Sequence, residues 1–239
     1  LSNTIPRDGV LLTADGIFFS RLRSDAQELN CRAELAEPDG TEPEFDFPEN
    51  IALAGLADKI ETRLSDGVAK LQPGEADSVV IAGMGGELII KILENGRHMW
   101  DPVKQWVLSP QSEIFKVRRW LFENGFVIRK EDMVLEDGKF YTVMDVRREK
   151  DADSEGKTVD PDVLSLSEDS RMLYGDYLIR TKNPVLLTYL KEEEAKILRF
   201  IEDLSAKAGD SERAAERLSE LKLQLKENQE VQHEMQGDH

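Results

Sequence analysis

The chain has 239 residues, of which 40% are hydrophobic and 33% are charged, and its formal net charge is −17 at pH 7. This content is enough for a globular core, and no hydrophobic run approaches the roughly 20 residues that a membrane-spanning helix needs. With one cysteine, Cys31, and three dispersed histidines, the sequence offers neither an internal disulfide nor a Cys/His metal cluster. We therefore expect a soluble, cytoplasmic protein without a bound metal.

Residues 49–148 alternate between helix-like and strand-like patterns. In chain order they predict a helix over 49–59, a strand over 59–67, a strand over 77–83, a helix over 87–96, a strand over 103–110, a helix over 112–125 and a β-hairpin over 126–148. The strand 77–83 is continuously hydrophobic, as in a parallel sheet with both faces covered, and we expect the following helix to be buried. The order predicts an α/β fold with a mostly parallel sheet and a terminal β-hairpin, in which ligands bind at the carboxyl ends of strands.

Two of these elements carry more detailed predictions. The hairpin is expected to turn at Asp137-Gly138. The helix 112–125 is expected to place a hydrophobic stripe in the core, made of Ile114, Phe115, Val117, Trp120, Leu121 and Phe122.

The last third of the chain has a helical pattern. Residues 149–161 are polar and typical of a linker. A first hydrophobic stripe consists of Leu190, Ile197, Leu198, Ile201 and Leu204, and a second, after a break at Gly209, of Ala214, Leu218, Leu221 and Leu225. Two such stripes predict an antiparallel helical hairpin or coiled coil, which is either a stabilising or dimerising arm or a contact for a macromolecular substrate. We expect residues 229–239 to fray.

The chain is thus expected to have four parts. These are a divergent N-terminal segment (1–48), an α/β domain (49–150), a linker (151–165) and a C-terminal helical arm (166–239).

The strongest local motif is the glycine turn Ala82-Gly83-Met84-Gly85-Gly86, placed between the strand 77–83 and the helix 87–96. A phosphate-binding P-loop requires G-x-x-x-x-G-K-[ST], and a dinucleotide fingerprint requires G-x-G-x-x-G; neither spacing is present. Two interpretations remain. The turn is either purely structural, or it lets a flat substrate or the reactive end of a cofactor approach the backbone closely.

Three motifs in the order IAGMGG (81–86), LSPQS (108–112) and EDGKFY (136–141) resemble the TrmK family of bacterial tRNA adenine-N1 methyltransferases. The resemblance is close over about residues 49–148 and loose over 170–230. It implies a class I methyltransferase (Rossmann-like) fold, S-adenosyl-L-methionine as the cofactor, and methylation of adenine 22 in tRNA at N1.

The resemblance also implies roles for particular residues. Asp66 and Gly67 would lie near the adenine of the cofactor, and Ala82 and Gly83 would also contact the cofactor, in the turn that lines the methyl-transfer site. The methyl-transfer site would be lined by Gly83, Met84, Gly85 and Gly86. Ser109, Pro110 and Gln111 would form a facing wall, where the Gln111 amide can both donate to and accept from an adenine edge.

The predicted chemistry requires little of the protein. Adenine N1 has a lone pair and no proton, so the protein must supply in-line alignment and exclusion of water rather than a strong base. A base that is stacked or paired in the RNA must first be extruded. Although the chain is acidic overall, a basic stretch offers candidates for phosphate contacts: Arg118, Arg119, Arg129, Lys130 and Lys139. We expect Trp120 and Phe126 to belong to the core.

Residues 1–48 depart from the family pattern. The family has a glycine-rich loop that reads approximately D-I-G-[ST]-D-H and holds the amino-acid end of the cofactor, and no match is present. Residues 9–19 have strand character with a turn at Asp15-Gly16, whereas 23–49 lack clear periodicity. Because the similarity begins abruptly near Glu49, we hypothesise a replaced N-terminal segment. The main alternative function is therefore a non-catalytic RNA-binding or assembly protein that has lost the cofactor loop. A third is a coiled-coil interaction protein.

Overall fold

The computed structural model describes residues 9–12, 18–22, 52, 55, 60–148, 166–207 and 212–237. The chain divides into two compact units, Leu1–Ser109 and Pro110–His239, which we describe separately. All of the helix expected over 49–59 except residues 52 and 55, the whole linker and the break at Gly209 lie outside the described residues. None of the described helices is long and apolar enough to cross a membrane.

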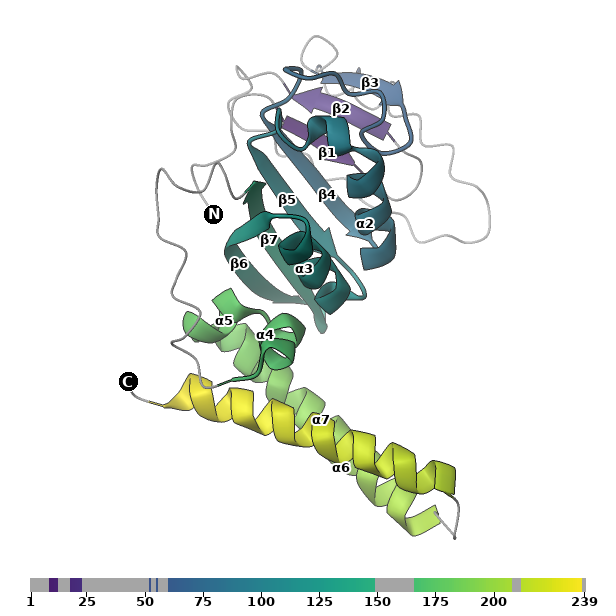
Figure 1. Cartoon of the computed structure of the whole chain (residues 1–239), viewed down its shortest axis with the longest axis vertical. Helices are drawn as coiled ribbons and strands as arrows, with labels where there is room; N and C mark the ends of the chain where they lie inside the picture. The colour runs from purple at the N-terminus through teal and green to yellow at the C-terminus, as the bar shows by residue number, and fades with distance from the viewer. Residues whose placement is uncertain are drawn as a thin grey trace. The chain divides into compact units, whose positions relative to one another are not determined.

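The described residues of the first unit form five strands: β1 (Gly9–Leu12), β2 (Phe18–Leu22), β3 (Ile60–Leu64), β4 (Ser78–Met84) and β5 (Gln105–Pro110), the last ending at the boundary of the unit. They are hydrogen-bonded neighbours in the order β3-β2-β1-β4-β5 (Figure 1). The predicted strands at 59–67, 77–83 and 103–110 are confirmed.

The strand directions correct the prediction of a mostly parallel sheet. β1 is parallel to β4, but it is antiparallel to β2, and β2 is antiparallel to β3. The physical reason is the length of the connection between β1 and β2. Five residues, 13–17, separate them, whereas a parallel pair needs a crossover of a dozen or more residues.

Helix α2 (Gly86–Asn95) follows β4 directly and ends at Gly96. It buries Ile89, Ile92 and Leu93. Leu88 is 42% exposed, so the helix that we expected to be buried is buried on one face only. The helix is amphipathic, with one hydrophobic face in the core.

The rest of the first unit positions β5. A 3₁₀ helix, η1 (Arg97–Met99), follows α2, and the indole nitrogen of Trp100 donates to the carbonyl oxygen of Leu93 at 2.8 Å. On the adjacent strands, Ser78 Oγ donates to Gln105 Oε1 at 3.1 Å. The core of the unit is fully buried at Val79, Ile81, Leu93, Met99, Val103, Trp106 and Leu108.

The second unit begins with helix α3 (Ile114–Glu123) and the strands β6 (Phe126–Glu136) and β7 (Lys139–Arg148). The two strands form the predicted antiparallel hairpin, in which Glu136 pairs with Lys139. The turn residues Asp137 and Gly138 both have positive φ, 49° and 74°. Positive φ at both positions is the conformation that Asp-Gly favours in a two-residue hairpin turn.

The predicted core stripe of α3 is only partly correct. Val117 and Leu121 are buried, but Phe115 is 41% and Phe122 65% exposed. The third buried residue is Arg118, which we expected at the surface. The buried face of α3 is thus rotated from the stripe that hydrophobicity alone suggested.

The helical arm follows as α4 (Glu168–Tyr174), α5 (Asp176–Arg180), α6 (Pro184–Lys207) and α7 (Glu212–Gln236). α6 and α7 run side by side as the predicted hairpin (Figure 1). At the root of the arm, one hydrophobic cluster joins α4–α7 to β6: Met133, Tyr174, Leu178, Ile179, Leu186, Leu190, Val231 and Met235.

This cluster corrects the expectation that residues 229–239 fray. α7 is helical to Gln236, and Val231 and Met235 are 0% and 5% exposed. The end of α7 returns to the root of the arm, where burial of these side chains holds it in place.

Candidate active site

The glycine turn lies at the carboxyl end of β4, as predicted. Gly83 is exposed and has a φ of +77°. A Cβ atom built on it would meet nothing within 4 Å, so this glycine is required by its backbone conformation and not by its neighbours. The structure therefore has open space beside the backbone at the position where a ligand was expected.

The residues after Gly83 connect the turn to α2. Met84 is 3% exposed and anchors the end of β4 in the core. Gly85 is the N-cap of α2, and its carbonyl oxygen accepts from the amides of Leu88 and Ile89, both at 3.1 Å. No side chain caps this helix. The burial of Met84 and the hydrogen bonds at the start of α2 thus fix the turn, and Gly83 is its exposed residue.

Asp66 and Gly67 follow β3 in a turn. The amide of Ala69 donates to the carbonyl oxygen of Asp66 at 3.2 Å, and the Asp66 side chain is exposed. Gly67 has a φ of +55°, and a Cβ there would lie 2.7 Å from Cγ2 of Ile92 on α2. Gly67 is therefore required for packing against α2, whereas Asp66 is free to face a ligand.

Ser109, Pro110 and Gln111 lie at the end of β5, as predicted. Ser109 is half-buried, Pro110 is buried and Gln111 is exposed. Glu113, the N-cap of α3, has a φ of +46°, which is uncommon for a residue with a side chain. The backbone therefore turns sharply between this strand and α3.

Among the predicted phosphate contacts, Arg118 does not fit. Its side chain is 3% exposed and paired with Glu131, which is 1% exposed. Lys139 and Lys130 are exposed and Arg129 is half-buried. Arg119 is exposed and lies 2.6 Å from Asp169 on α4. Four of the five basic residues therefore have surface positions, and Arg118 has an internal one.

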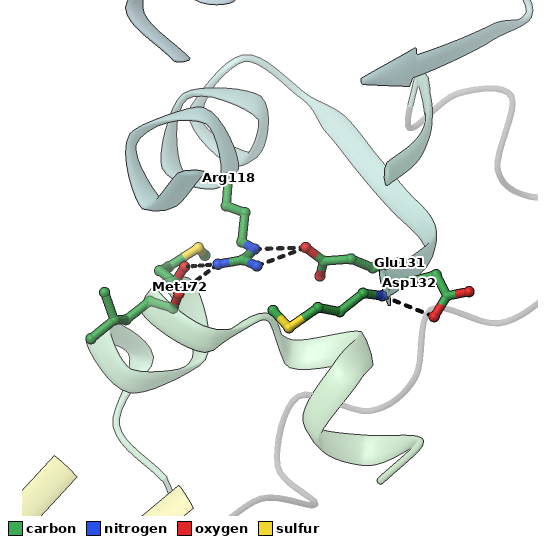
Figure 2. Close-up of polar contacts among 6 residues, drawn as sticks. Arg118, Glu131, Asp132 and Met172 are labelled. Atoms are coloured by element: carbon green, nitrogen blue, oxygen red, sulfur yellow. Dashed lines mark hydrogen bonds and ion pairs between the residues drawn. The ribbon is translucent and has the colours of Figure 1, made fainter. Parts of the chain in front are cut away.

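Figure 2 shows the surroundings of Arg118. Its Nε and Nη2 atoms donate to Oε1 of Glu131 at 2.9 and 2.8 Å, and its Nη1 donates to the carbonyl oxygens of Met172 and Leu173 at 2.8 and 2.6 Å. Burial raises the pKa of the Glu131 carboxyl, although the nearby guanidinium opposes the shift. Arg118 thus connects α3, β6 and α4 and cannot reach an RNA phosphate in this arrangement.

The glycine turn and Asp66 offer groups that an organic cofactor could contact. Among the described residues, no group of three or more His, Cys, Asp or Glu could hold a metal ion. The open backbone at Gly83 and the exposed carboxylate of Asp66 offer what a nucleoside-containing ligand needs. Backbone groups can receive its amino-acid end, and an acceptor can bind its exocyclic amine.

The strand order, the glycine turn after β4 and the comparisons with solved structures define a class I, S-adenosylmethionine-dependent methyltransferase. The family model described as tRNA (adenine(22)-N(1))-methyltransferase, TrmK, matches residues 47–230. This chain belongs to that family.

Individual relatives support the same family. The tRNA (adenine(22)-N(1))-methyltransferase of Bacillus subtilis is 32% identical over 180 residues, which are 75% of this chain and 71% of the relative. The crystal structure of B. subtilis TrmK has a TM-score of 0.61 at 31% identity and covers 77% of this chain and 75% of that one. Streptococcus pneumoniae Sp1610 in complex with S-adenosyl-L-methionine has a TM-score of 0.61 at 28% identity, covering 78% and 74%.

The polar interior of the arm was not predicted. Glu193 Oε2 accepts from Tyr174 Oη at 2.8 Å and from Asn228 Nδ2 at 2.9 Å, and Glu193 Oε1 accepts from Tyr189 Oη at 3.2 Å. The one available signal was a polar residue at the 3–4 spacing of α7: Asn228 lies three residues after Leu225 and is 0% exposed.

Proposed function

We propose that this chain transfers the methyl group of S-adenosyl-L-methionine to N1 of adenine 22 in tRNA. The observation that carries the proposal is the open glycine turn at the carboxyl end of β4. Gly83 has a positive φ that residues with a side chain rarely adopt, yet no neighbouring atom requires the glycine. Family membership supplies the reaction and the substrate.

The side chains can then be given roles. S-adenosyl-L-methionine supplies an activated sulfonium methyl group when it is bound. Asp66 would accept a hydrogen bond from the exocyclic amine of the cofactor. The backbone of Ala82, Gly83, Met84, Gly85 and Gly86 would line the methyl-transfer site, while the Met84 side chain stays buried in the core. Ser109 and Pro110 form a wall for the target adenine, and the Gln111 amide orients its edge. These residues align the reactants and exclude water, and no strong base is needed because adenine N1 carries no proton.

For the RNA, we propose that Arg119 and Lys139 contact phosphates, with Arg129 and Lys130 beside them. Such contacts supply affinity that falls as the salt concentration rises. A tRNA substrate places the enzyme in the cytoplasm. Self-association through the C-terminal helices remains a prediction, since α6 and α7 already pair with each other within the chain.

One observation favours the alternative, a non-catalytic RNA-binding protein. The family motif has a glycine-rich loop after its first strand, but here only five residues separate β1 from the antiparallel β2. Residues other than this loop must therefore hold the amino-acid end of S-adenosyl-L-methionine if the chain is to bind the cofactor. If no such residues exist, the chain does not bind the cofactor.

The proposal is tested by incubating the purified full chain with S-adenosyl-L-methionine and an unmodified tRNA transcript that contains adenine 22. Mass spectrometry of the digested RNA should show 1-methyladenosine at that position, and a transcript with guanine 22 should gain no methyl group there. RNA binding without methylation of either transcript would support the non-catalytic alternative.

A further inference from the structure

The outward face of α3 combines exposed aromatic and basic side chains. Phe115 and Phe122 are 41% and 65% exposed, and Lys116 and Arg119 are exposed as well. At 3.6 residues per turn, positions 115, 119 and 122 lie within about 60° of one another around the helix. We refer to Phe115, Lys116, Arg119 and Phe122 as the α3 face.

This combination suits single-stranded nucleic acid. Proteins bind unpaired nucleotides by stacking bases on aromatic rings while basic side chains contact the phosphates. A phenylalanine that is two-thirds exposed on a helix with other buried hydrophobic residues contributes little to the core. Phe122 and the less exposed Phe115 lie on either side of Arg119 along the helix, and together they offer ring faces and a positive charge on one surface.

The charge of α3 differs from that of the other helices with exposed hydrophobic residues. Because Arg118 is buried in its pair with Glu131, the exposed charged residues of α3 are the basic Lys116 and Arg119 and the acidic Glu123, in a chain with a net charge of −17. α6 exposes Phe200 and α7 exposes Leu223, but acidic residues outnumber basic ones by five to four on α6 and by six to four on α7. A polyanion is therefore attracted to the α3 face more strongly than to the exposed hydrophobic residues of the arm.

The α3 face also lies close in sequence to the proposed site. Gln111, proposed to orient the target adenine, precedes the first residue of α3 by three positions. The ten residues of α3 extend about 15 Å from there. The α3 face therefore begins four residues after a side chain proposed to contact the target base.

We propose that the α3 face binds the tRNA beside the target adenine. Phe115 and Phe122 stack on unpaired bases, and Arg119 and Lys116 contact the flanking phosphates. The inference rests on the proposed function, because it takes tRNA as the partner.

Asp169 would compete with an RNA phosphate for the Arg119 guanidinium. The pair is 2.6 Å apart, with side chains 47% and 77% exposed. An exposed ion pair of this kind contributes little in water, so a phosphate can replace Asp169 as the partner of Arg119. Removal of the Asp169 charge should therefore strengthen RNA binding.

The test is fluorescence anisotropy with a labelled, unmodified tRNA transcript and the full chain, without cofactor. Phe122→Ala should weaken binding by roughly fivefold or more, the loss of one stacked base. Arg119→Gln should weaken binding and lower the slope of log K against log salt by about 1. Asp169→Asn should tighten binding. The matched controls are Phe200→Ala, which removes a phenylalanine that is 60% exposed, and Arg217→Gln, which removes an exposed arginine paired with Glu220.

The outcomes separate this inference from the proposed function. If the wild-type chain binds tRNA and the α3 variants bind as tightly as the controls, the inference is wrong and the proposed function stands. If the folded wild-type chain binds no tRNA, the proposed function fails. If Phe122→Ala abolishes self-association and leaves tRNA affinity unchanged, the α3 face is a contact between copies of this chain and the inference is overturned.

Discussion

Arg118 on α3 and Glu131 on β6 form a buried ion pair, in which two guanidinium nitrogens donate to one carboxylate oxygen at 2.9 and 2.8 Å. The remaining donors of Arg118 reach the carbonyl oxygens of Met172 and Leu173 near the end of α4. One side chain of α3 thereby satisfies groups on two other elements, β6 and α4. The helical arm is joined to the hairpin and α3 through this pair and the hydrophobic cluster beside it.

Breaking this pair should strongly destabilise the chain. Arg118→Ala leaves the Glu131 carboxylate and two backbone carbonyls without their donor, which should cost about 3–5 kcal/mol. Arg119→Ala, which breaks the exposed pair with Asp169, should cost less than about 1 kcal/mol. Urea unfolding followed by circular dichroism measures both. Equal stability of the two variants would contradict the role of Arg118.

Gly175 should tolerate no side chain. Its φ is +94°, and a Cβ would lie 2.5 Å from Oε2 of Glu131 and 3.0 Å from Nη2 of Arg118. Gly138 has a similar positive φ of +74° with nothing within 4 Å. Gly138→Ala should therefore cost the backbone strain alone, about 1–2 kcal/mol, and Gly175→Ala about 3 kcal/mol or more, because it also displaces the ion pair. Equal losses in urea unfolding would show that the ion pair adjusts freely.

The end of α7 should contribute to stability. Met235 is 5% exposed in the cluster at the root of the arm, whereas Leu223 on the same helix is 58% exposed. Met235→Ala should cost about 2–5 kcal/mol, and Leu223→Ala should change stability by no more than about 0.5 kcal/mol. Thermal unfolding of the two variants gives the comparison. A neutral Met235→Ala would mean that residues 229–239 fray in solution.

The arm should lose stability in alkali. Burial, with the Glu193 carboxylate as the next cause, raises the pKa of Tyr189 from 10.0 to about 12, and burial also raises the pKa of Tyr174. Because the folded pKa lies above the unfolded value, this stability is fully present below about pH 10 and is lost as the pH rises through 12. The loss from Tyr189 should be roughly 2–3 kcal/mol.

Absorbance of tyrosinate and ellipticity at 222 nm, followed together against pH, test this. Tyr189→Phe should make unfolding less sensitive to pH between 10 and 12. If Tyr189→Phe unfolds with the same pH dependence as the wild type, ionisation of Tyr189 does not cause the loss of stability in alkali.

Much of the fold could be predicted from local patterns. The continuous hydrophobic run before Gly83 identified β4, and Asp137-Gly138 identified the hairpin turn, because the residues of each segment favour one backbone conformation without help from distant residues. The stripe at Leu190 and Leu221 similarly gave the helical hairpin. The glycine turn was located for the same reason.

The errors came from long-range partners. Hydrophobicity placed Phe122 inside and Arg118 outside, but Arg118 is buried because Glu131 and two carbonyl groups, 13 and about 54 residues away, satisfy it. The burial of Met235 likewise depends on α7 returning to the root of the arm. Residues 9–19 were interpreted as strand-like with a turn at Asp15-Gly16, and the structure has there the strand β1 and the start of the antiparallel strand β2.

The central claim is that the open turn at Gly83 is a cofactor site, and calorimetric titration of the full chain with S-adenosylhomocysteine tests it most directly. The wild type should bind in the micromolar range. Gly83→Ala, which adds a methyl group where no protein atom stands, should abolish binding, whereas Gly138→Ala, with the same backbone strain, should bind as the wild type does. A folded wild-type chain that binds no S-adenosylhomocysteine would contradict the account and leave a non-catalytic RNA-binding protein.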